Sequence, residues 1–148
     1  MRRELAGGFE LDDDLGRVDV DAVHAFLSRE SYWGRERTRE LVERAIMGST
    51  RVVGLYDGAE QIGFARAVSD GATVAYLADV YVLSAYRGRG LGLELVREIV
   101  DSEVGGFSSN VRWLLHTADA QGLYGKLGFG EGAPPYPLME RPRLADRQ

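Results

Sequence analysis

Two arginines and three glycines gather in the middle of the sequence, between a β-type stretch and a helical one. They are Arg87, Gly88, Arg89, Gly90 and Gly92. Glycine allows a backbone to approach a ligand closely, and arginine donors match phosphate oxygens. From Leu91 to Val100, apolar side chains recur at the three- and four-residue spacing of a buried helix face. Because the first turn of a helix offers unpaired N–H groups to an anion, this segment predicts a pyrophosphate cradle.

The cradle matches neither of two common phosphate-binding motifs. A P-loop needs a Lys-Ser or Lys-Thr pair, which this segment lacks, and a dinucleotide fingerprint needs a third glycine at the position of Leu93. The next apolar strand, Trp113 to Leu115, also lacks a final acidic residue that could hold a ribose. The remaining pattern is R-x-x-G-x-G after a strand and before a helix. It resembles the acetyl-CoA-binding motif [RQ]-x-x-G-x-[GA] of the GNAT superfamily of N-acetyltransferases.

A second segment, from Asp119 to Phe129, resembles another signature of that family. Tyr124 stands at the family's tyrosine, and Gly128-Phe129 stands at its Gly-Phe pair. The two motifs follow in the family's order, and the resemblance covers nearly the whole chain. It implies that acetyl-CoA is the cosubstrate and that Tyr124 is the general acid for the departing CoA sulfur. A packed aromatic beside Phe129 is the alternative for Tyr124.

The resemblance also places the cofactor on the strand before the cradle. In the family, pantetheine pairs with the backbone of this strand like an added strand, and an N–H there polarises the acetyl carbonyl. The implied cofactor-binding positions are Val80, Tyr81, Val82, Arg87, Gly88, Arg89, Gly90, Leu91, Gly92 and Asp119.

The proton acceptor for the amine has two candidates. Asp79 interrupts an apolar strand, where an acid is rarely placed without a partner. It resembles the aspartate that contacts the amine in polyamine-acetylating relatives, although Ala78 replaces an acid found in some of them. A structural hydrogen bond across the sheet is the alternative for Asp79. His116 ends a predicted strand, and histidine as a residue type suits proton transfer near neutral pH; a structural histidine is its alternative.

Three aromatic residues are candidates for the acceptor site. Tyr32 and Trp33 fall between the first two predicted helices, a connection that forms one wall of the acceptor site in the family. They could enclose a cationic amine through cation–π contacts, or they could fill the core under the loop. Tyr76 occupies the strand position where some family members have a catalytic glutamate, so that glutamate is not available here.

The elements that must position these residues follow from the local patterns. Asp19 can cap a helix from Val20, and a second helix is expected from Arg37 to Met47. Asp57-Gly58 and Asp70-Gly71 predict two hairpin turns between alternating strands. A strand from 111 to 116, a short helix from 119 to 127 and closing strands at 129 and at 138–140 complete the chain. The order β-α-α-β-β-β-α-β-α-β-β predicts an α/β, GNAT-like fold: a mixed, mostly antiparallel central sheet flanked by helices, in a single domain spanning 1–148.

Composition excludes several other classes of protein. The chain has 148 residues, a net charge of −5 and no cysteine, which argues against a nucleic-acid surface, disulfides and a cysteine acyl-enzyme. No stretch approaches a membrane span, and neither His24 nor His116 stands in metal-ligand spacing with carboxylates. We expect a cytoplasmic protein without a metal or membrane partner, and family habit suggests a homodimer.

Taken together, the sequence predicts an acetyl-CoA-dependent N-acetyltransferase. It would transfer an acetyl group directly to a primary amine in a ternary complex, since no activated nucleophile is visible. A small-molecule amine fits a single compact domain better than a protein tail does. A non-catalytic acyl-CoA-binding or regulatory module, and an enzyme that acetylates a protein amine, are the alternatives.

Overall fold

The computed structural model describes residues 1–101, 105–131 and 137–147. The chain divides into two compact units, Met1–His116 and Thr117–Gln148, and each is described by itself. The expected single domain stays a prediction.

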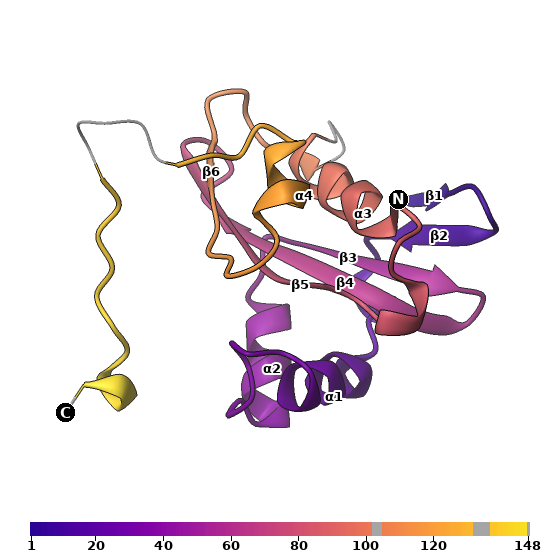
Figure 1. Ribbon diagram of the computed structural model, residues 1–148, viewed down its shortest axis with the longest axis horizontal. Helices are drawn as coiled ribbons and strands as arrows, with labels where there is room; N and C mark the ends of the chain where they lie inside the picture. The colour runs from indigo at the N-terminus through magenta and orange to yellow at the C-terminus, as the bar shows by residue number, and fades with distance from the viewer. Residues whose placement is uncertain (102–104, 132–136, 148) are drawn as a thin grey trace. The chain divides into compact units, whose positions relative to one another are not determined.

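A six-stranded sheet forms the centre of the first unit (Figure 1). Its strands lie side by side in chain order, and every pair is antiparallel except the last, which is parallel. The strands are β1 (Arg2–Glu4), β2 (Phe9–Asp12), β3 (Arg51–Asp57), β4 (Glu60–Ser69), β5 (Val74–Val82) and β6 (Arg112–Leu114). The predicted mixed, mostly antiparallel sheet and both Asp-Gly hairpins are confirmed, whereas the sequence patterns did not predict β1.

Helices cover both faces of this sheet. Helices α1 (Val20–Arg29) and α2 (Arg39–Met47) lie on one face, and α3 (Leu91–Val100) lies on the other (Figure 1). Asp19 caps α1 as predicted, accepting the N–H of Ala22 at 2.9 Å. Helix α2 begins two residues later than expected, because Thr38 accepts the N–H of Leu41 and acts as its cap.

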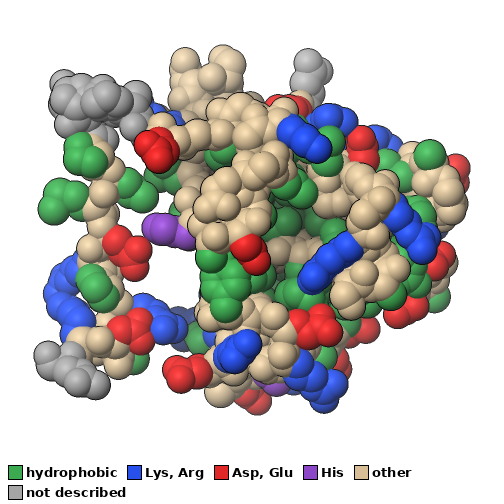
Figure 2. Space-filling model, in the orientation of Figure 1, with side chains coloured by type: hydrophobic (Ala, Val, Ile, Leu, Met, Phe, Trp, Pro, Cys, Tyr) green, Lys and Arg blue, Asp and Glu red, His purple; other side chains and the backbone are tan. Residues whose placement is uncertain are grey.

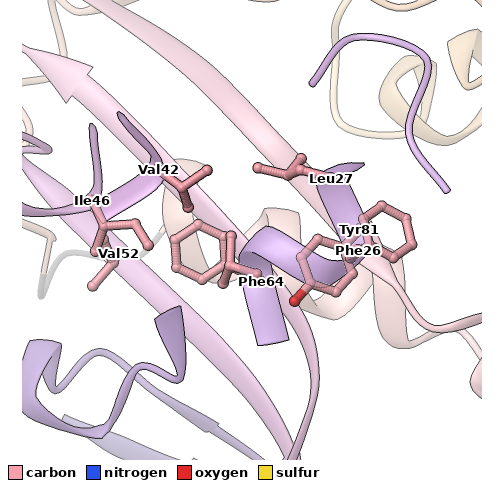
Figure 3. Packing of buried hydrophobic residues seen from close by; sticks show 8 residues of the cluster. Phe26, Leu27, Val42, Ile46, Val52, Phe64 and Tyr81 are labelled. Atoms are coloured by element: carbon pink, nitrogen blue, oxygen red, sulfur yellow. The ribbon is translucent and has the colours of Figure 1, made fainter. Parts of the chain in front are cut away.

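One hydrophobic cluster joins α1 and α2 to the sheet (Figure 3). Phe26 of α1 stacks on Tyr81 of β5, with ring centroids 3.9 Å apart and planes 7° from parallel. Phe64 of β4 lies against the same tyrosine. The other buried members are Val23, Leu27, Val42, Ile46 and Val52. This packing fixes the α1–α2 connection over the middle of β4 and β5.

A buried ionic network ties α3 to the opposite face. Arg51 of β3 donates to the Glu98 carbonyl at 2.6 Å and to its carboxylate at 3.3 Å. Arg3 of β1 donates to the same carboxylate at 2.8 Å. Because the Arg51 and Glu98 side chains are almost fully buried, removing one partner would leave an uncompensated charge. The network therefore anchors the C-terminal half of α3 to the sheet.

The second unit contains helix α4 (Gln121–Gly125) and a short 3-10 turn at Leu144–Asp146. Among its described residues, 117–131 and 137–147, none forms a strand. The closing strands expected at 129 and at 138–140 are therefore not found in those residues. Pro134-Pro135, a proline pair that the sequence places between these two expected strands, lies outside the described residues. Pro137 has no N–H to donate to a sheet ladder, which gives one reason for the difference. No described helix is both long and apolar enough to cross a bilayer.

Candidate active site

Strand β5 carries a bulge in the middle of its pairing with β4. Phe64 lies opposite Tyr81, but Arg66 lies opposite Ala78, so β5 contains one more residue than β4 in this interval. Asp79 absorbs the extra residue with φ of 53°, the only positive φ of a non-glycine residue in the described parts of the chain. An aspartate tolerates this left-handed conformation better than most residues. The bulge changes which side chains of β5 share a face.

Beyond the bulge, one edge of β5 lacks a neighbouring strand in the described part of the chain. Strand β6 pairs only with Val74–Tyr76. The N–H of Leu83 bonds to β4 at 2.8 Å, and the Tyr81 carbonyl faces Gly63 of β4. Since successive residues of a strand alternate sides, the backbone of Val82 faces the open edge. This edge can accept an extended ligand as an added strand.

The predicted cradle lies directly after that edge. Gly90 is the N-cap of α3 with φ of 76°, and no side chain caps the helix there. Gly88 has φ of 78°, and a Cβ added at either glycine would point into open space. The Arg87 side chain points back toward β5, where its Nε donates to the Val82 carbonyl at 2.9 Å. The arrangement leaves first-turn N–H groups of α3 able to bind an anion.

Arg89 lies beside two aromatic rings at the same end of α3. Its guanidinium carbon is 5.9 Å from the centroid of Phe9 and 5.7 Å from that of Tyr86. The Tyr86 hydroxyl donates to Asp57 at 3.0 Å. These contacts hold Arg89 close to the helix terminus. On the face drawn in Figure 2, basic and acidic described side chains alternate rather than form one continuous basic stripe.

Three residues donate hydrogen bonds to Asp79, two from the α1–α2 connection and one from β4. Trp33 Nε1 donates to Oδ1 at 2.9 Å, and Arg37 Nη1 donates to Oδ1 and Oδ2 at 2.8 and 2.9 Å. Arg66 Nε donates to Oδ2 at 2.6 Å. Burial acts to raise the pKa of Asp79, but the charges and hydrogen bonds of Arg66 and Arg37 prevail and lower it. A carboxylate this occupied is a weak proton acceptor.

The sequence profile of the acetyltransferase (GNAT) family matches residues 20–129 of this chain. That span includes α1, the bulged strand, the cradle and the Tyr124 segment. The chain belongs to the GNAT family.

Solved structures and a curated protein agree with this membership. A solved structure of a Xanthomonas campestris protein, described as a candidate acetyltransferase of the GNAT family, is 34% identical in sequence and superposes with a TM-score of 0.84. The match covers 94% of this chain and 97% of that protein. Staphylococcus aureus SA2161, described as a probable acetyltransferase of unknown function, is 25% identical with a TM-score of 0.74, covering 91% and 99%. A Gibberella zeae protein, FG08082, whose name gives acetyltransferase as its expected activity, is 28% identical and covers 81% of this chain and 77% of its own.

In this GNAT protein, the two candidate acceptor-site aromatics of the α1–α2 connection have different surroundings. Trp33 packs against Phe26 of the core cluster while its N–H points to Asp79. Tyr32 lies edge-on to Trp33 and is half exposed. Trp33 therefore combines a packing role with a polar contact, which is closer to the core-filling alternative. A cation–π role for Tyr32 stays a prediction.

The two remaining site residues of the first unit lie together. The Tyr76 hydroxyl and His116 Nδ1 are 2.7 Å apart, and the two rings are 5.8 Å apart at 49°. Tyr76 is partly exposed on β5, next to the end of β6. This contact joins two residues forty positions apart, which sequence spacing did not predict. It orients the imidazole of His116, because one ring nitrogen is engaged.

Tyr124 belongs to α4 in the second unit. Its ring lies 5.8 Å from Phe129 in an edge-on contact, and the N–H of Phe129 donates to the Tyr124 carbonyl at 3.2 Å. Gly128 between them has φ of 85°, which allows the chain to turn back. The predicted local motif is therefore formed. The catalytic role of Tyr124 and the cofactor contact of Asp119 stay predictions.

Sequence reasoning missed Arg37 and Arg66, which both contact Asp79. Arg66 offered a signal, because it interrupts the apolar segment from Ile62 to Val68 just as Asp79 interrupts an apolar segment. Opposite charges at inward positions of adjacent strands indicate an ion pair. Arg37 offered none, because it lies in the loop before α2 and reaches Asp79 only in the folded protein.

Proposed function

We propose that this GNAT protein is an acetyl-CoA-dependent N-acetyltransferase that acts on a small primary amine. The observation that carries the proposal is the edge of β5 beyond its bulge, which has no neighbouring strand among the described residues. This edge leads directly into the glycine-lined N-terminus of α3. An extended thioester cofactor needs both features, because its pantetheine arm pairs with a strand edge and its pyrophosphate needs N–H donors. Arg89 adds a positive charge at the same terminus.

The proposed transfer is direct. The amine loses a proton to His116, its nitrogen attacks the thioester carbon, and the collapsing intermediate breaks the carbon–sulfur bond. Tyr124 gives a proton to the departing thiolate, and the second amine proton, lost from the tetrahedral intermediate, restores the Tyr124 hydroxyl. The products are an acetamide, free CoA and a proton on His116. A backbone N–H at the bulge stabilises the oxyanion. Asp79 acts as a positioning residue for the α1–α2 connection, because its oxygens already accept four hydrogen bonds.

Thiol release from acetyl-CoA in the presence of amines tests the proposal, together with thermal shift by CoA. We expect CoA to raise the Tm, and at least one amine to give turnover. Tyr124→Phe should lower kcat by about 10–100-fold and leave the CoA shift intact. Stabilisation without turnover on amines or peptides would instead indicate an acyl-CoA-binding module. If CoA does not raise the Tm at all, the pyrophosphate site predicted at the start of α3 is wrong.

A further inference from the structure

Two guanidinium groups share one carboxylate beside the candidate acceptor site. Arg37 and Arg66 both pair with Asp79, and in the described part of the chain neither forms a salt bridge to another acid. The count leaves one positive charge in excess. The Arg37 side chain is 22% exposed and that of Arg66 is 13% exposed, whereas Asp79 is 4% exposed. The positive groups, and not the carboxylate, are therefore accessible to a ligand.

Both arginines keep donors available. Arg37 uses Nη1 for Asp79, and Arg66 uses Nε for Asp79, with a long 3.5 Å contact from Nη1 to Ser49. Among the described residues, Arg37 Nη2 and Arg66 Nη2 have no protein acceptor. A guanidinium group with free N–H groups in a half-buried place binds carboxylate or phosphate oxygens strongly.

The pair lies on the same sheet face as Tyr76. Along β4, Phe64, Arg66 and Val68 point to one face, and the ladder places Val68 opposite Tyr76 and Arg66 opposite Ala78. This face is buried at Phe64 and becomes exposed at Val68 and Tyr76. Diagonal neighbours of an antiparallel pair lie about 7–8 Å apart. One small molecule can therefore reach Arg66 and the Tyr76–His116 pair at the same time.

We propose that the acceptor amine carries a second, anionic group, a carboxylate or a phosphate, and that Arg37 and Arg66 bind it. The inference rests on the proposed function, since it names the substrate class of that same site. It replaces the cationic amine that Asp79 and the aromatics first indicated: a second ammonium group would meet the excess positive charge, while an oxyanion would neutralise it. Because both guanidinium groups pair with Asp79, the carboxylate holds Arg37 and Arg66 side by side, where both can contact one anion.

A matched set of acceptors tests the charge preference of the wild-type protein. 4-Aminobutyrate, 4-amino-1-butanol and putrescine place a carboxylate, a hydroxyl or an ammonium group four carbons from the same reacting amine. O-Phosphoethanolamine and ethanolamine give the corresponding pair for phosphate. We expect kcat/KM for the better of the two anionic acceptors to exceed that of its neutral partner by about tenfold or more. Putrescine should be the poorest of its three.

Arg37→Gln separates anion binding from general effects. It should lower the kcat/KM of the anionic acceptor relative to its neutral partner about tenfold, chiefly through a higher KM for the anionic acceptor. Arg35→Gln is the matched control, since it removes the same charge from the same loop, where Arg35 Nε contacts the Ser31 carbonyl. If Arg37→Gln proves unstable, Arg66→Lys is the second variant. It keeps the positive charge but loses the planar, bidentate donor geometry of arginine, and it should also raise KM for the anionic acceptor.

The outcomes distinguish the two proposals. If the protein acetylates neutral amines or putrescine with a kcat/KM equal to or higher than that of the anionic acceptors, the anionic acceptor class is wrong. The proposed acetyltransferase activity would still be supported. Equal effects of Arg37→Gln and Arg35→Gln on the anionic acceptor would also overturn it. Absence of turnover on every small amine and on peptides, with CoA still stabilising the protein, would refute both the acetyltransferase and its acceptor class.

Discussion

Arg66 on β4 donates its Nε–H to Asp79 Oδ2 on β5 at 2.6 Å, at the point where β5 bulges and Asp79 adopts φ of 53°. The ion pair and the bulge support each other. The left-handed residue costs backbone energy, and the buried carboxylate needs donors. Arg66 and Arg37 supply those donors while the bulge turns the carboxylate toward them. One contact thus links the shape of β5 to the charge of the proposed acceptor site.

Substitutions at Asp79 should show both parts of this relationship. Asp79→Asn keeps the shape and the tolerance of positive φ but loses the charge, and we expect a loss of about 2 kcal/mol in the free energy of unfolding. Asp79→Ala should lose about 1 kcal/mol more, because an alanine is strained in the left-handed region. Asp79→Gly should recover that additional loss. Urea denaturation measures all three, and equal stability of the alanine and glycine variants would contradict the strained bulge.

The stability of the protein should depend on the charge of Asp79 in acid. Its native-state pKa lies below the ordinary value of 3.8, so the stabilisation is fully present above about pH 4 and is lost as pH falls through the native pKa. The difference in unfolding free energy between the wild type and Asp79→Asn should therefore be constant near neutral pH and shrink below pH 4. Other carboxylates with lowered pKa values, among them Asp70 and Glu10, cancel in that difference. A difference that is unchanged down to pH 2 would show that the ion pair contributes nothing.

A methyl group at the N-cap of α3 should weaken CoA binding. Gly90→Ala places a Cβ where the phosphates are expected to approach, and we expect CoA affinity to fall about tenfold or more by calorimetry. Gly71→Ala is the matched control: Gly71 has φ of 77° against 76° for Gly90, it too has open space around its Cβ, and it lies in the β4–β5 turn. Both variants should lose similar stability from backbone strain. Equal CoA affinities in the two would place the pyrophosphate elsewhere.

The contact between Tyr76 and His116 leads to a separate prediction about kcat. His116→Gln should lower kcat about 100-fold if the imidazole accepts the amine proton. Tyr76→Phe removes the hydroxyl 2.7 Å from Nδ1 and should lower kcat by a smaller factor, about tenfold, through poorer orientation of the ring. The CoA-induced thermal shift should stay the same in both. Wild-type rates in His116→Gln would assign the proton to another acceptor.

Local sequence patterns predicted most of the first unit. Strand alternation and two Asp-Gly turns predicted β3, β4 and β5, because both signals act between neighbouring residues. Asp19 predicted the start of α1, since a helix cap needs only the adjacent turn. The short strand β1 escaped prediction because its pairing with β2, and the contact of Arg3 with Glu98, come from residues far away in the chain.

The sequence by itself determined the GNAT motifs, the glycine-lined start of α3 and the singular position of Asp79 in an apolar strand. Only the tertiary structure decided which side chains Asp79 contacts, because its three partners come from the α1–α2 connection and from β4. The same holds for the pairing of Tyr76 with His116. A residue's type and local spacing fix its backbone preference, but its charge environment is set by whichever distant side chains packing brings to it. In the folded protein, the acid that the sequence suggested for a cationic amine accepts hydrogen bonds from two arginines.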